Sequence, residues 1–151
     1  MSVVALTGRQ AQAVDALVRA GRLQRVDPDL DKAERFMAQA AEGLAELVHV
    51  RASHVRYDIG YNAAHDVGEA VLAAYGFRTA SGPGQHVALG SFLEAVFDTP
   101  PPSDAARQFE RMRTARNNLR YQARPTGAAL SERAVRAAAV LIDAARERIQ
   151  Q

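Results

Sequence analysis

A run of arginines in the last third of the chain carries the residue types best suited to chemistry. Residues 111–124 read RMRTARNNLRYQAR, with five arginines, two asparagines and one tyrosine. Guanidinium groups form paired hydrogen bonds with phosphate oxygens, an asparagine amide adds further hydrogen bonds, and a tyrosine ring stacks on a base. These types indicate a phosphate-binding surface. Its candidate residues are Arg113, Arg116, Asn117, Arg120, Tyr121 and Arg124.

The same stretch is also typical of a solvated helix face. Placed on a helix, its apolar side consists of Phe109, Met112, Ala115 and Leu119, and the arginines fall on the adjoining side. Like charges three or four residues apart repel each other, so something should offset this cost. Carboxylates such as Asp66 or Glu69, a phosphate-bearing ligand or water would each do so, and the sequence leaves the three open.

Hydrophobic periodicity predicts the helices that position these residues. They cover about residues 8–20, 30–49, 54–77, 85–98, 104–123 and 130–149. Thr7 is the expected cap of the first helix, Asp27 or Asp29 of the second, and Ser103 of the fifth. No segment alternates convincingly as a strand. The sequence therefore predicts an all-α, antiparallel up-and-down bundle of five to six helices, forming a single domain over residues 1–151.

A polar stripe on the predicted third helix is a weaker candidate site. It consists of Asp58, Asn62, His65, Asp66 and Glu69. The His65–Glu69 spacing suits two ligands of one metal ion, but a solvated or salt-bridging face is the favoured interpretation. Tyr57, Tyr61 and Tyr75 are expected in the core or in an interface. We therefore expect neither a metal ion nor a cofactor.

Composition limits the class of protein. The 151 residues include no cysteine, which excludes disulfides, cysteine nucleophiles and thiolate zinc sites. No apolar run is long enough to cross a bilayer, so we expect a cytoplasmic protein without a membrane partner. The formal net charge is +2, with acidic residues in excess over residues 1–100 and basic residues in excess over residues 101–151.

Two stretches resemble one known family. GYNAAHDVGEAVLAAYGFR (60–78) resembles the second helix of HEPN domains, named for higher eukaryotes and prokaryotes nucleotide-binding, which ends in Gly-aromatic-Arg. RTARNNLRYQAR (113–124) resembles the family's signature helix, in which Arg-Asn is followed by His or Tyr. The resemblance covers about residues 30–150 and leaves 8–20 as an extra N-terminal helix. It implies a helical bundle, usually dimeric, with signature helices facing each other.

The resemblance also implies a set of functions. Many members are metal-independent ribonucleases and toxins, while others pair with nucleotidyltransferases or bind nucleotides or RNA without cutting. The cutting form has Arg, four to six residues, then His; here Tyr121 stands at that distance from Arg116, and no arginine has a histidine there. Tyrosine, with a pKa of about 10, is a poor base at neutral pH.

We therefore expect a homodimer that associates with RNA or nucleotides without cleaving them, within a toxin–antitoxin or nucleotidyltransferase-linked system. The expected protein partner is accordingly an antitoxin or a nucleotidyltransferase. Two alternatives stay open. One is a metal-independent ribonuclease in which Arg116 stabilises charge and Tyr121 replaces the histidine. The other is a scaffold dimer whose arginines neutralise carboxylates and which works by binding a partner.

Overall fold

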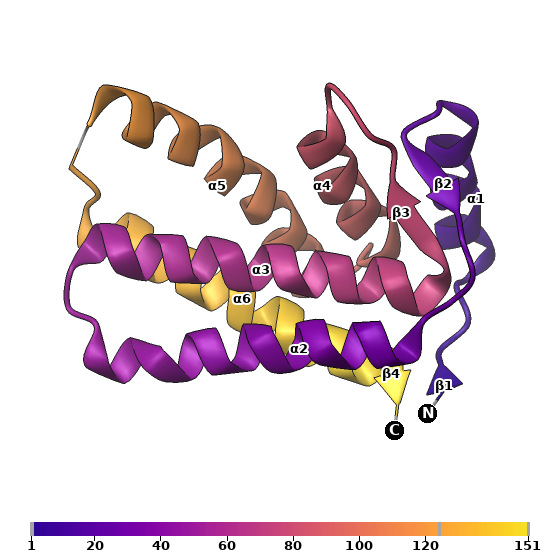
Figure 1. Cartoon of the computed structure of the whole chain (residues 1–151), viewed down its shortest axis with the longest axis horizontal. Coiled ribbons are helices and arrows are strands. Elements are labelled where there is room, and N and C mark those ends of the chain that lie inside the picture. The colour runs from indigo at the N-terminus through magenta and orange to yellow at the C-terminus, as the bar shows by residue number, and fades with distance from the viewer. Residues whose placement is uncertain (1, 124, 151) are drawn as a thin grey trace.

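The chain folds as a bundle of helices, shown in Figure 1. The computed structural model describes residues 2–123 and 125–150, with 119–121 described by their backbone alone. The described elements are β1 (Ser2–Val3), α1 (Gly8–Arg19), β2 (Leu23–Arg25), α2 (Leu30–Ala45), a 3-10 helix η1 (Glu46–His49), α3 (Ser53–Tyr75), β3 (Phe77–Thr79), α4 (Gln85–Val96), α5 (Pro102–Gln122), α6 (Ala128–Arg148) and β4 (Ile149–Gln150). The predicted all-α class is confirmed.

The central element of the bundle is α3. Small and apolar residues are buried along most of its length, from Tyr57 to Ala74. Helices α2 and α6 pack against it, and α4 and α5 cover its remaining side (Figure 1). A Cβ added to Gly60 would lie only 2.9 Å from backbone atoms of Ala134 and Val135, so α3 and α6 cross in close contact. Helix α5 packs against both α3 and α6, so this crossing determines the surface that α5 contacts.

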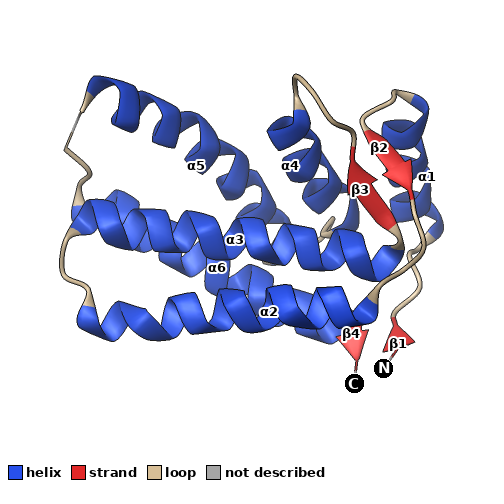
Figure 2. Cartoon of the chain, viewed as in Figure 1, coloured by secondary structure: helices blue, strands red, loops and turns tan. Residues whose placement is uncertain are grey.

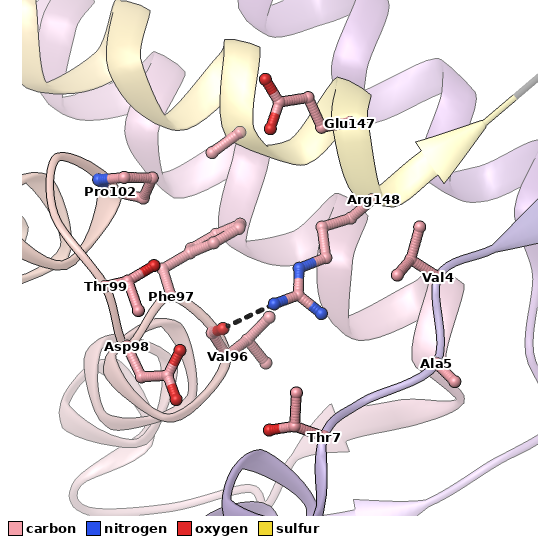
Figure 3. A pocket seen from close by; sticks show the side chains of 11 residues that line it. Val4, Ala5, Thr7, Val96, Phe97, Asp98, Thr99, Pro102, Glu147 and Arg148 are labelled. Carbon is pink, nitrogen blue, oxygen red and sulfur yellow. Dashed lines mark hydrogen bonds between the residues drawn. The ribbon is translucent and has the colours of Figure 1, made fainter.

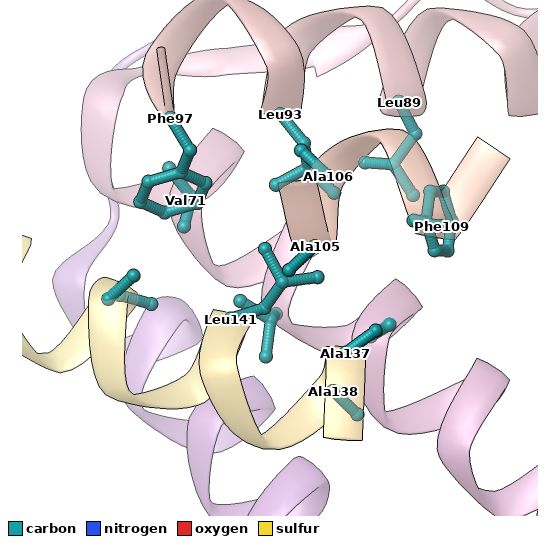
Figure 4. Close-up of a cluster of buried hydrophobic side chains, with 14 of the residues drawn as sticks. Val71, Leu89, Leu93, Phe97, Ala105, Ala106, Phe109, Ala137, Ala138 and Leu141 are labelled. Atoms are coloured by element: carbon teal, nitrogen blue, oxygen red, sulfur yellow. The ribbon is translucent and has the colours of Figure 1, made fainter. Parts of the chain in front are cut away.

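The core lies between α3, α4, α5 and α6. Figure 4 shows Val71 of α3, Leu93 of α4, Ala105 of α5 and Leu141 of α6 meeting there. These side chains are all nearly or fully buried. Because each of the four helices contributes an apolar face, burial of that face is what holds the bundle together.

Two predicted helix caps are confirmed and one is wrong. The Thr7 hydroxyl oxygen accepts a hydrogen bond from the Gln10 backbone N–H, and the Gln10 side-chain oxygen accepts one from the Thr7 backbone N–H, forming a capping box. Asp29 caps α2 by accepting from the Lys32 amide at 2.9 Å. Ser103 does not cap α5, because the helix already begins at Pro102 and Ser103 lies buried in its first turn.

Two small sheets contradict the expectation that no strands form (Figure 2). Strand β1 pairs antiparallel with β4, placing Val3 opposite Ile149, and β2 pairs antiparallel with β3. Each strand has only two or three residues, too few to show an alternating pattern in the sequence. The helix predicted over 54–77 consequently ends at Tyr75, where Gly76 adopts a left-handed conformation with φ 81°.

The sequence predicts that no segment crosses a membrane, and the length and hydrophobicity of the helices can be compared with that prediction. Within the two described ranges, we find no helix that is both long and apolar enough to cross a bilayer.

Candidate nucleic-acid interface on α5

The arginine-rich helix α5 is anchored to α3 by its N-terminal half. Phe109 and Met112 are each 1% exposed, as their place on the predicted apolar stripe requires. Ala115 is half-buried, and the side chain of Leu119 falls outside the described part of the chain. The buried Tyr57 hydroxyl donates to the Met112 carbonyl oxygen at 2.6 Å. This bond sets the position of α5 and directs the next turn toward α3.

Arg116 is the residue that α5 places against α3. Its Nε lies 3.5 Å from a carboxylate oxygen of Asp58, and its guanidinium carbon lies 4.7 Å from the centre of the Tyr61 ring. Phe109 stacks on Tyr61 at 5.4 Å with planes 12° apart. The cation is therefore supported by an aromatic ring and attracted by a carboxylate. Its buried Nε makes no hydrogen bond within the described residues.

Arg113 is held on its own helix. Glu110 accepts from Arg113 Nε at 3.1 Å and from a terminal nitrogen at 2.6 Å, a two-point ion pair. The hydrogen bonds to Glu110 raise the pKa of Arg113 above its usual value. Among the described ion pairs, the carboxylates that pair with Arg113 and Arg116 are Glu110 and Asp58, rather than the Asp66 or Glu69 that the sequence offered as examples. Asp66 instead accepts from the Gln39 side-chain amide at 3.1 Å.

The other predicted site residues are placed as follows. Asn117 is exposed on α5 directly after Arg116, about 100° further around the helix. Arg120 and Tyr121 belong to the last turns of α5, but their side chains lie outside the described residues. Arg124 lies outside the described residues altogether. The structure thus brings Arg116 together with Tyr61 and Asp58, and Arg113 with Glu110.

A histidine pair lies beside the Arg116–Tyr61 contact. His65 lies one turn after Tyr61, with ring centres 6.5 Å apart, and the His86 ring of α4 lies 6.2 Å from His65. Burial lowers the pKa of His65, an effect that Glu69 and Asp66 partly oppose. The sequence places Tyr61 and His65 on one helix face, but it gives no indication that His86 of another helix meets them.

The two buried tyrosines, Tyr57 and Tyr61, are packing aromatics and cannot act as bases at neutral pH. Burial raises the pKa of Tyr57 to about 12 and that of Tyr61 above its usual value, so both hydroxyls stay protonated at neutral pH. Their burial confirms the expectation that they are core aromatics. Across the described residues, no group of three or more His, Asp or Glu side chains is arranged to hold a metal ion.

Comparisons of this chain with family models, curated proteins and solved structures find no match. The resemblance to HEPN domains therefore stays a prediction.

Proposed function

We propose that the chain associates with RNA or nucleotides through the arginine face of α5, without cleaving them. The observation that carries the proposal is the state of Arg116. Its 3.5 Å contact with Asp58 is longer than a strong charge-assisted hydrogen bond, and its Nε has no hydrogen-bond partner among the described residues. The Nε itself is covered, but the side chain as a whole is 27% exposed, so a phosphate oxygen approaches the guanidinium from its exposed part.

The surroundings of Arg116 favour a phosphate over a neutral ligand. The guanidinium of Arg116 is packed on the Tyr61 ring and is therefore already restricted in conformation. Binding a ligand then costs less side-chain entropy than it would for a free arginine. Arg111 and Asn117 are exposed elsewhere on α5, and each supplies donors to a nucleic-acid backbone that passes along this helix. The stacked Tyr61 ring is covered by Arg116 and Phe109, so it is not a platform for a base.

The proposal of binding without cleavage rests on the tyrosines near Arg116 and on the sequence resemblance, and the cleavage assay tests whether His65, one turn from Tyr61, supplies a base instead. Breaking a phosphodiester bond requires proton transfer by a group whose pKa lies near the working pH, and such a group contributes about 10²–10⁴-fold in rate. Tyr57 and Tyr61 have pKa values too high for this role. The sequence has Tyr121 where the family's ribonucleases have histidine. A HEPN-like dimer in a toxin–antitoxin or nucleotidyltransferase-linked system is the finer form of this proposal, and it rests on the sequence resemblance.

The ion pairs themselves favour a second candidate, a scaffold that binds a protein partner. Arg113 is neutralised by Glu110 and Arg116 is attracted by Asp58, so both arginines contribute to holding α5 in place. If the protein is a scaffold, replacing these arginines lowers its stability, and the wild type itself does not bind nucleic acid. RNA binding by the wild type therefore distinguishes the two candidates.

The test incubates the purified protein with labelled bulk RNA in the absence of metal ions and scores retention and cleavage together. Arg116→Ala is compared with Arg107→Ala, an exposed arginine on the first turns of α5 that pairs with Asp104. We expect salt-sensitive retention that Arg116→Ala weakens by about tenfold and Arg107→Ala leaves near wild type.

Other outcomes contradict the proposal. Cleavage by the wild type would make the protein a ribonuclease. Absence of retention, together with a lower melting temperature for Arg116→Ala, would support the scaffold instead.

A further inference from the structure

A separate polar pocket lies at the end of the bundle where β1 and β4 meet. The segment before α1, the α4–α5 connection and the last turn of α6 enclose a volume of about 300 Å³. This volume lies at the lower limit of the range for small-molecule sites, so it suits a ligand of only a few heavy atoms. Its walls include the apolar side chains of Val4, Val96, Phe97 and Ala144.

One cation points into this pocket. Figure 3 shows the Arg148 guanidinium directed between Val96 and Thr7. It donates to the Val96 carbonyl oxygen at 3.2 Å and to the Tyr75 hydroxyl oxygen at 3.3 Å. Tyr75 in turn donates to the Val4 carbonyl oxygen at 2.6 Å. Neutral oxygens thus hold the guanidinium, and no carboxylate of residues 2–123 or 125–150 forms an ion pair with it. These two bonds do not use all five of its N–H groups.

One carboxylate of the same pocket is held independently. Asp98 accepts a hydrogen bond at 2.9 Å from the side-chain amide of Gln10, which is only 3% exposed. The other end of that amide accepts from the Thr7 backbone, within the capping box of α1. A buried side chain therefore fixes Asp98 at the pocket, whereas the carboxylate of the lining residue Glu147 is turned away from the Arg148 guanidinium (Figure 3).

These positions define the charge that a ligand must carry. Arg148 and Asp98 line one pocket, are held by different partners and form no ion pair with each other. A simple anion would be repelled by Asp98, and a simple amine would be repelled by Arg148. A molecule that carries both charges satisfies both sides. The apolar walls favour a short hydrocarbon group on the same molecule.

We propose that this pocket binds a small zwitterion of the α-amino-acid class with an apolar side chain. Its carboxylate pairs with Arg148, its ammonium group pairs with Asp98, and its hydrocarbon part lies against Val96 and Phe97. The proposal uses none of the residues on the arginine face of α5, so it goes beyond nucleic-acid association and can be tested separately.

The test titrates the full chain by calorimetry with three probes of similar shape. These are L-leucine, 4-methylpentanoate without the ammonium group, and 3-methylbutan-1-amine without the carboxylate. We expect L-leucine to bind about tenfold more tightly than either of the others, because each missing charge removes one charge-assisted contact. Asp98→Asn keeps the oxygen that accepts from Gln10, and it should weaken L-leucine binding about tenfold.

Control variants separate binding from folding. Asp143→Asn changes a carboxylate on α6 that does not line this pocket, and it should bind L-leucine as the wild type does. Arg148→Lys keeps the positive charge but loses the paired N–H groups of the guanidinium. Weaker L-leucine binding by this variant, at an unchanged melting temperature, supports the proposed contact. The proposal is overturned if L-leucine gives no binding heat at millimolar concentration, if 4-methylpentanoate binds equally well, or if Asp98→Asn has no effect.

Discussion

The guanidinium of Arg116 on α5 rests on the ring face of Tyr61 on α3, 4.7 Å from its centre. The contact joins the helix that is richest in arginine to the central helix of the bundle. The ring is 5% exposed and belongs to the core, whereas the Arg116 side chain is 27% exposed and reaches the surface. A ligand that binds this arginine therefore acts on a residue that is packed directly against the core.

Replacing the Tyr61 ring tests that contact. Tyr61→Phe keeps the stacking with Phe109 and the surface under Arg116, whereas Tyr61→Leu removes both. We expect Tyr61→Leu to lower the free energy of unfolding by about 1–3 kcal/mol more than Tyr61→Phe. Urea denaturation of both variants gives the difference, and equal losses would show that the ring face contributes nothing beyond its volume.

Neutralising Asp58 should have opposite effects on folding and on binding. The pair with Arg116 is partly exposed on both sides, so Asp58→Asn should cost only about 0.2–1 kcal/mol of stability. The same change releases Arg116 toward a phosphate and should strengthen RNA retention by about two- to fivefold. Filter binding at two salt concentrations measures the effect. Weaker retention by Asp58→Asn would contradict the proposed role of Arg116.

The pKa of His65 gives the stability a dependence on pH. Since burial lowers this pKa in the folded chain, the unfolded chain binds the proton first as pH falls. Stability should therefore decrease as pH falls below about 6.5, the reference value for histidine, and level off below the folded-state pKa. Urea unfolding from pH 7.5 to 5 should show a smaller decrease for His65→Gln. His54→Gln is the matched control, because His54 is exposed on the first turn of α3. If His54→Gln removed the pH-dependent decrease in stability and His65→Gln did not, the assignment to His65 would be wrong.

Two glycines in helices should respond oppositely to the same substitution. A Cβ at Gly60 meets the α6 backbone at 2.9 Å, whereas one at Gly43 meets only the Ile59 side chain at 3.9 Å. Gly60→Ala should therefore destabilise by about 1–3 kcal/mol, through forced separation of α3 and α6. Gly43→Ala should stabilise by up to about 1 kcal/mol, because alanine is the better helix former. The melting temperatures of the two variants are compared with that of the wild type. A rise for both variants would show that helix propensity alone sets the effect and that α3 and α6 do not cross closely at Gly60.

The sequence predicted the helices because each one repeats its apolar residues over several turns. The capping residues Thr7 and Asp29 were also predictable, since their side chains bond within three residues. Strands β1 to β4 were not, because two or three residues show no period and owe their pairing to distant segments.

The candidate site was predictable only within one helix. Arg113 and Arg116 fall on one face by helical spacing, and Glu110, three residues before Arg113, was a readable ion-pair partner. The approach of Asp58 and Tyr61 to Arg116, and of His86 to His65, depends on how α3, α4 and α5 cross. Crossing angles arise from side-chain packing throughout the core, and no local pattern in the sequence records them.

The pairing of β1 with β4 sets an order of events during synthesis. Val3 is synthesised long before its partner Ile149, because helices α1 to α6 lie between them in the sequence. The segment before α1 must therefore wait, unpaired, until α6 has been translated. The pocket around Arg148 shares these two segments, so it comes into existence only with the last turn of α6. A nascent chain that stalls before this point already contains the residues of α3 and α5, but it lacks the pocket.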